Sequence, residues 1–273
     1  MNQIKIAWIG KHFGEEPPLV GENSQGAGGI FFSGCNLRCV FCQNVQISQG
    51  GLGRNYSVKE LADEMIRLQS EGAVNIDLVT PTIWWRSIRE AILLARARGL
   101  KLPIVWNSNA YESLEIINGV ADVVDIFLPD FKYADDEMAE KYSGVKKYFG
   151  TAARAIRRMF ELNGELKVNE NGIAERGVIV RHLVLPNAME NSFGVLETIA
   201  NISPKIHVAL MNQYIPMARA MEFPEINRRV SEEEFASVRS RMELLGLENG
   251  WVQGEGGAMV PDFGVERPFD GAG

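Results

Sequence analysis

The sequence predicts an α/β fold, specifically a partial (β/α)6 TIM-like barrel. Short apolar segments alternate with amphipathic segments six times along the chain, as expected when helices join parallel strands. The strand segments are apolar almost throughout, which is typical of strands buried on both faces. A closed barrel needs eight such units and typically about 250 residues, so six units predict an open barrel. A doubly wound open sheet is the alternative, because local patterns do not determine strand order.

Each predicted strand is a short apolar run that ends at a turn signal. The first ends at Ser33 and Gly34, and the second stops at Pro81, which lacks the N–H group that a central strand must donate. In chain order, the predicted strands are residues 29–32, 75–80, 103–107, 123–130, 177–185 and 206–211.

The predicted helices combine end signals with apolar residues at helical spacing. Ser57 and Ser231 each precede a glutamate by three positions, the pattern of a capping box, and Gly99 closes the second helix. The helical segments are residues 57–68, 88–99, 111–118, 135–163 with breaks near Gly144 and Gly150, a helix containing 195–199, and 231–245.

The whole chain, residues 1–273, is expected to form one domain with a barrel core at 29–249. Residues 1–28 and 250–273 lie outside the six units and are rich in Gly and Pro. We interpret them as an N-terminal extension and a C-terminal tail that cover the barrel mouth or its open edge. Segments 10–29 and 250–273 have few apolar anchors, so we expect them to become ordered when a partner or substrate fills the mouth.

Composition limits the functions that are open to the chain. The formal net charge of −7 argues against nucleic-acid binding, which requires clustered Lys and Arg. No apolar run approaches the roughly 20 residues of a membrane span. Reduced cysteines and the lack of a secretory signal predict a cytoplasmic protein.

All three cysteines of the chain lie in one eight-residue loop after the first strand. Cys35, Cys39 and Cys42 have the spacing C-x3-C-x-aromatic-C. Three thiolates can hold a [4Fe–4S] cluster and leave one iron open to a ligand from outside the protein. A zinc site is the alternative, with a fourth ligand from His12, His182 or His207. An odd number of cysteines argues against a disulfide framework.

Polar residues follow each of the six predicted strands, and in parallel α/β folds ligands bind at this end of the sheet. An open iron could chelate the amine and carboxylate of an amino acid. Arg181 could pair with that carboxylate, and hydroxyl and amide side chains could contact a ribose and the amine. Phe41 could pack against an adenine ring or anchor the loop. The remaining candidates are Thr80, Thr82, Asn107, Ser108, Asn109, Asp130, Lys132 and Tyr214.

With the cysteine spacing after the first strand, the chain resembles the radical S-adenosylmethionine (SAM) enzymes. Further segments are similar to the pyruvate formate-lyase-activating-enzyme-like group of iron–sulfur proteins, and the likeness extends roughly from Gly29 to Gln253. These segments are residues 29–44, 77–82, 128–133, 181–187 and 249–253.

The resemblance implies one [4Fe–4S] cluster that binds SAM and cleaves it reductively to a 5′-deoxyadenosyl radical, which removes hydrogen from a substrate. It also places Asp130 and Lys132 near SAM. No cysteines remain for a second cluster, so the electron is expected to come from an external flavodoxin or ferredoxin.

The chain departs from the glycyl-radical activases at three strand ends. Their Gly-Gly-Glu is Thr80-Pro81-Thr82, their Asp-Thr-Asn-Gly is Asn107-Ser108-Asn109-Ala110, and their Pro-Tyr-His is Asn212-Gln213-Tyr214. The substrate is therefore open between a glycine of a protein, a peptide and a small metabolite. A non-catalytic iron–sulfur carrier or sensor is the alternative from another class.

Overall fold

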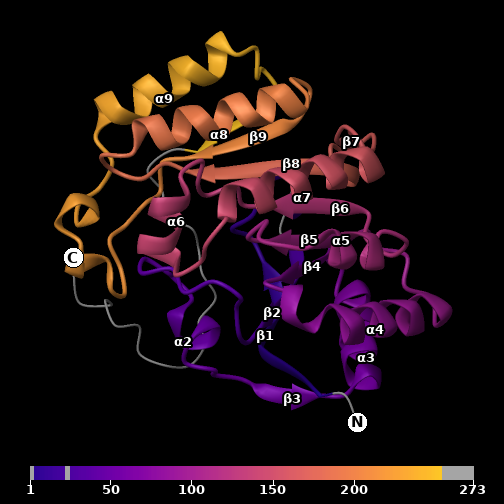
Figure 1. The fold of residues 1–273 in the computed structure, drawn as a ribbon. Helices are drawn as coiled ribbons and strands as arrows, with labels where there is room; N and C mark the ends of the chain where they lie inside the picture. Colours follow the sequence, from indigo (N-terminus) through magenta and orange to yellow (C-terminus); the bar gives the residue numbers. More distant parts are fainter. Residues whose placement is uncertain (1–2, 22–24, 254–273) are drawn as a thin grey trace.

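The computed structural model describes residues 3–21 and 25–253, which form a curved parallel sheet flanked by helices (Figure 1). The parallel strands of the sheet follow the order of the chain without reversal. This order confirms the partial barrel and rules out the doubly wound alternative, in which strand order reverses. Within the described residues the sheet is not closed. The six parallel strands are β2 (Ala27–Phe32), β4 (Ile76–Val79), β5 (Ile104–Ser108), β6 (Ile126–Pro129), β8 (Ala174–Leu183) and β9 (His207–Met211).

Both edges of the sheet are built from strands that the sequence analysis did not predict. β1 (Ile4–His12) pairs antiparallel with β2, and β3 (Arg54–Tyr56) pairs antiparallel with β1. At the other edge, β10 (Gly250–Gln253) runs parallel to β9. The short β7 (Lys167–Val168) pairs antiparallel with β8. The N-terminal extension thus contributes a strand to the sheet.

The expectation that segment 10–29 becomes ordered when a partner or substrate binds is wrong for those of its residues that lie in strands. Residues 10–12 belong to β1 and residues 27–29 to β2, and His12 pairs with Ala27 in the ladder. Between them, α1 (Pro17–Val20) buries Leu19 completely. Residues 254–273 lie outside the described residues.

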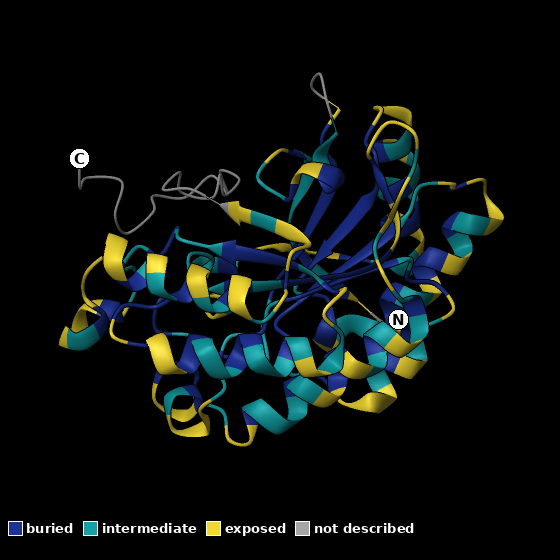
Figure 2. Cartoon of the chain, turned by 90° about the horizontal axis from the view of Figure 1, so that it is seen from above, coloured by how far each residue is buried: buried dark blue, intermediate teal, exposed yellow. Residues whose placement is uncertain are grey.

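Most of the helices pack along one side of the sheet, and Figure 2 shows their exposed residues facing outward while the central strands are buried. Both predicted capping boxes are present, since the hydroxyls of Ser57 and Ser231 accept the N3 amides of their helices. The break at Gly144 is confirmed, but Gly150 lies inside a helix. The helices are α2 (Val45–Ser48), α3 (Val58–Ser70), α4 (Trp85–Ala97), α5 (Leu114–Val120), α6 (Asp136–Ser143), α7 (Tyr148–Asn163), α8 (Met189–Ile202) and α9 (Glu232–Leu244). None in the described ranges is long and apolar enough to cross a membrane.

Candidate active site

The inner face of the barrel changes from apolar to polar along the strands. Val105, Leu128 and Ile179 form an apolar cluster with Leu19 of α1. Side chains two positions apart on a strand point to the same face, so the next residues on that face are Asn107, Asp130 and Arg181. These three line a cavity at the carboxyl ends of the strands. The strands therefore hold the polar groups on a rigid apolar base.

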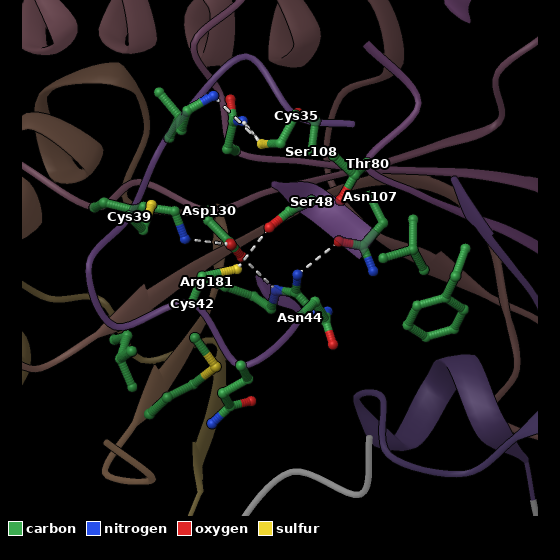
Figure 3. A pocket seen from close by; sticks show the side chains of 18 of the residues that line it. Cys35, Cys39, Cys42, Asn44, Ser48, Thr80, Asn107, Ser108, Asp130 and Arg181 are labelled. Atoms are coloured by element: carbon green, nitrogen blue, oxygen red, sulfur yellow. Dashed lines mark hydrogen bonds and ion pairs between the residues drawn. The ribbon is translucent and has the colours of Figure 1, made fainter. Parts of the chain in front are cut away.

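The three cysteines line the same cavity (Figure 3). Their loop is tied to the end of α6, because the amides of Arg38 and Val40 donate to the carbonyls of Ser143 and Tyr142 at 2.9 and 2.8 Å. The strand order thus brings the cysteine loop and the polar strand ends together.

Each cysteine sulfur has a polar neighbour. Ser143 Oγ donates to Cys39 Sγ at 3.0 Å, Ser48 Oγ lies 3.2 Å from Cys42 Sγ, and Asn109 Nδ2 donates to Cys35 Sγ at 3.4 Å. Burial raises the pKa of all three thiols, and that of Cys42 to about 12. Buried thiolates at neutral pH therefore require a nearby positive charge. Iron supplies that charge, so the donor set fits an iron–sulfur cluster.

Asp130 lies between two cations at the end of β6. Its Oδ1 accepts from Arg181 Nε and its Oδ2 from Lys132 Nζ, both at 2.7 Å. Burial alone would raise the pKa of Asp130, but Arg181 and then Lys132 lower it to about 2. Asp130 is therefore ionised and fixed in orientation at neutral pH.

The guanidinium of Arg181 is held on three sides. Besides Asp130, its Nη2 donates to Asn107 Oδ1 at 2.6 Å and its Nη1 to Glu15 Oε2 at 2.8 Å. Glu15 was missed by the sequence reasoning, which treated its segment as a covering. The sequence did contain one signal of a functional site here. His12, Glu15 and Glu16 lie within five consecutive positions inside a segment rich in Gly and Pro.

A buried tyrosine of α7 joins the turns that follow β5 and β6. The hydroxyl of Tyr148 accepts the amide of Lys132 at 2.9 Å and lies 2.9 Å from the carbonyl oxygens of Asn109 and Asp130. In the sequence, Tyr148 carried no signal that separates it from an ordinary core residue.

Of the other predicted residues, all but one line the cavity. Ser108 and Asn109 do so from the end of β5, and Thr80 does so in a left-handed conformation with φ of 61°, which is costly for a β-branched residue. Phe41 and Tyr214 pack edge to face with their ring centres 5.7 Å apart. The Tyr214 hydroxyl donates to the Ile226 carbonyl, so Tyr214 offers its ring rather than its hydroxyl.

Thr82 is the exception, since it does not line the cavity. Its hydroxyl donates to the buried Glu112 at 2.9 Å, as does Trp106 Nε1, and Ser108 Oγ donates to the other oxygen at 2.8 Å. Burial raises the pKa of Glu112 despite these bonds. Thr82 thus belongs to a structural cluster that the sequence reasoning did not recognise.

The zinc alternative finds little support among the histidines. His182 is completely buried, and its Nδ1 and Nε2 contact the Phe131 carbonyl at 2.7 Å and Ser192 Oγ at 2.9 Å. The His207 ring packs beside Trp251, and His207 is not among the residues that line the cavity. His12 does line it, but among the described residues its Nε2 contacts Glu15 at 3.0 Å and no cysteine sulfur.

Sequence comparison agrees with the geometry. Residues 30–176 match the radical SAM superfamily. An uncharacterised protein of Methanocaldococcus jannaschii is 33% identical over 247 residues, which are 87% of this chain and 66% of the relative. A pyruvate formate-lyase-activating enzyme of Clostridium pasteurianum is 25% identical over 65% of this chain and 69% of its own. A Listeria monocytogenes enzyme of the same name is 27% identical over 40% of this chain, and that match spans only 47% of the relative.

Solved structures share the fold at low sequence identity. A radical SAM methyltransferase from Sphaerobacter thermophilus has a TM-score of 0.57 and 17% identity, covering 83% of this chain and 66% of its own. SuiB of Streptococcus suis, bound to its precursor peptide SuiA, has a TM-score of 0.56 and 12% identity over 81% of this chain and 47% of its own. The superfamily implies a [4Fe–4S] cluster and SAM, and the three cysteines at the cavity fit that cluster. The chain belongs to the radical SAM superfamily.

Proposed function

We propose that this protein cleaves SAM reductively and uses the 5′-deoxyadenosyl radical to remove a hydrogen atom from a substrate. The observation that carries the proposal is the shared cavity, which three partly buried cysteines line together with Asp130, Lys132 and Arg181. When bound, the reduced cluster supplies the electron for the cleavage. The residues around it hold the cofactor and exclude water.

Lys132 is the cation best suited to the carboxylate of SAM. An ammonium group has three N–H donors, and the hydrogen bond to Asp130 uses one of them. Arg181, by contrast, uses three of its five N–H groups on Asp130, Glu15 and Asn107, and its charge is shared between two carboxylates. We therefore assign Arg181 a positioning role. Thr80, Ser108 and Asn109 offer polar groups for the amine and ribose of the cofactor, and the Phe41 ring offers a surface for adenine.

A glycine of a partner protein is our first candidate substrate. Its support is the similarity to pyruvate formate-lyase-activating enzymes over as much as 65% of this chain. At residues 80–82 and 212–214 this chain differs from the glycyl-radical activases, so the glycine substrate is a proposal. A small metabolite or short peptide is the second candidate. It is favoured because the cavity continues inside the barrel to His12 and Glu15, whose side chains are each only 7% exposed.

We propose an external electron donor, since all three cysteines of the chain lie in the one loop that would hold the cluster. A flavodoxin or ferredoxin is the donor class that we propose, and the cytoplasm is the compartment that we propose.

The test is anaerobic incubation of the cluster-loaded, reduced protein with SAM, followed by chromatography of 5′-deoxyadenosine and methionine. Wild type is expected to form both, and Cys39→Ala neither. If wild type binds SAM without cleaving it, the protein is a carrier or sensor. Addition of a pyruvate formate-lyase then tests the glycine candidate, because success produces a glycyl radical signal in electron paramagnetic resonance (EPR). Cleavage without that signal favours a small substrate.

A further inference from the structure

A histidine and two carboxylates meet inside the barrel, at the edge formed by β1. His12 ends β1, Glu15 follows in the turn before α1, and Asp77 lies on β4. One donor atom from each lies within 4.8 Å of the others, and His12 Nε2 is 3.0 Å from Glu15 Oε1. The side chains of His12 and Glu15 are 7% exposed, and Asp77 is completely buried.

Asp77 is the unusual member of this group. Its buried Oδ1 has no hydrogen-bond partner among the described residues, and its Oδ2 has only a long contact of 3.5 Å from Asn107 Nδ2. A buried carboxylate without partners is costly, so the site is incomplete as it stands.

The nearby cations do not complete it. Lys132 donates to Asp130, and Arg181 makes ion pairs with Asp130 and Glu15. Their N–H groups are directed to these two carboxylates, and neither cation donates to Asp77 Oδ1 among the described residues. A bound cation would give this oxygen the partner that it lacks.

The donor set selects the kind of cation. An imidazole nitrogen with two carboxylates suits Zn²⁺, Mn²⁺ or Fe²⁺, whereas Mg²⁺ and Ca²⁺ prefer oxygen alone. Two ligands about 2.1 Å from one metal lie roughly 3 Å apart when they are adjacent, which matches the contact between His12 and Glu15. Arg181 fixes the other oxygen of Glu15, as outer partners fix the carboxylates of metal sites.

We propose that His12, Glu15 and Asp77 bind a divalent transition-metal ion or Zn²⁺, at a site separate from the cysteine loop. His12 and Glu15 line the same cavity as the cysteines. Three protein ligands leave coordination positions open, so an oxygen or nitrogen atom of a substrate can bind the ion there. The proposal does not depend on radical chemistry by the cluster.

The test uses Mn²⁺ as the probe and the cluster-loaded protein with its cluster in the oxidised, EPR-silent state. Bound Mn²⁺ is counted by the loss of the six-line EPR signal of free Mn²⁺. We expect one tight site per chain, which Zn²⁺ empties and equimolar Mg²⁺ does not. Asp77→Asn, which keeps the shape of the side chain, is expected to weaken binding by more than roughly tenfold. The matched control Asp122→Asn, at an exposed carboxylate paired with Arg89, should leave binding unchanged.

Thermal unfolding gives a second readout on the same proteins. Mn²⁺ should raise the Tm of wild type, because a ligand of the native state stabilises it, and should leave the Tm of Asp77→Asn unchanged. His12→Gln serves as an independent variant with the same expectation. The proposal is overturned if wild type binds no Mn²⁺ or Zn²⁺, or if both variants bind as tightly as wild type. SAM cleavage is measured separately, so its failure leaves this result standing.

Discussion

Arg181 and Glu15 form an ion pair of 2.8 Å between Nη1 and Oε2, although they lie 166 positions apart in the chain. The pair joins the turn after β1 to β8 across the interior of the barrel. Burial by itself would raise the pKa of Glu15, but Arg181 and His12 together lower it. Glu15 is therefore an anion at neutral pH and holds the Arg181 guanidinium against Asp130.

Replacing Arg181 by Lys should destabilise the protein. A lysine cannot reach Asp130, Glu15 and Asn107 together, so at least one buried carboxylate loses its partner. Breaking such a pair typically costs about 3–5 kcal/mol of unfolding free energy, measurable by urea denaturation. Arg89→Lys is the control, because its pair with Asp122 is exposed and should contribute at most about 1 kcal/mol. Equal losses in the two variants would contradict the positioning role.

Each cysteine should be necessary for the cluster. Each single variant leaves only two thiolates in the loop, and the chain has no other cysteine. Because two thiolates hold iron poorly, the three variants Cys35→Ala, Cys39→Ala and Cys42→Ala should behave alike. We expect loss of the brown colour, of bound iron and sulfide, and of SAM cleavage. A Cys35→Ala protein that retains its full iron and sulfide would refute the cluster assignment.

Asp130→Ala should impair cofactor binding and leave cluster assembly intact. The carboxylate orients Lys132 and Arg181, and losing a hydrogen bond to a charged group costs about 1.5–3 kcal/mol, roughly 10- to 150-fold in affinity. Equilibrium dialysis with SAM, on protein of matched iron content, measures this loss. Asp63→Ala, at a largely exposed pair with Arg98, serves as the control. Unchanged affinity in Asp130→Ala would remove Asp130 from the binding site.

Thr82→Val should reduce stability without changing affinity for SAM. The substitution removes one donor from the buried Glu112, which typically costs about 1–3 kcal/mol. Thr82 does not line the cavity, so SAM dissociation constants of variant and wild type should agree. A clear loss of affinity at unchanged stability would return Thr82 to the binding site.

The buried His182 should make the protein less stable in mild acid. Burial lowers its folded-state pKa from 6.5 to about 4, so the unfolded state binds the proton more strongly. The loss of unfolding free energy caused by His182 is absent above pH 6.5. It grows as pH falls toward 4, at up to about 1.4 kcal/mol per pH unit. Unfolding free energies at several pH values should fall more steeply for wild type than for His182→Asn. Parallel curves would contradict this assignment.

The parallel strands and most helices could be predicted because their signals are local. Buried strands such as β4 read as apolar runs that end at a proline, and the capping boxes at Ser57 and Ser231 are short motifs. β1 could not be predicted in the same way. It includes Lys5 and Lys11 and is only partly buried, and its place depends on pairing with β2. β10 likewise depends on contact with β9.

The same distinction between local signals and contacts of distant segments applies to the candidate site. The cysteine spacing and the polar strand ends are visible in the sequence because the end at which parallel strands bind ligands is fixed by their direction. Glu15 lines the cavity, and Asp77 lies beside its Asn107 wall, because β1 and β4 both pair with β2. Tyr148 and Glu112 act through hydrogen bonds between elements, which no local pattern encodes.

The cavity combines residues from inside and outside the segment that matches the superfamily. That segment, residues 30–176, contains the three cysteines, Asp130 and Lys132. His12 and Glu15 precede it and Arg181 follows it. A protein cut down to residues 30–176 would therefore lose both members of the Glu15–Arg181 ion pair and, with them, the groups that hold Asp130 in place from the far side of the barrel interior.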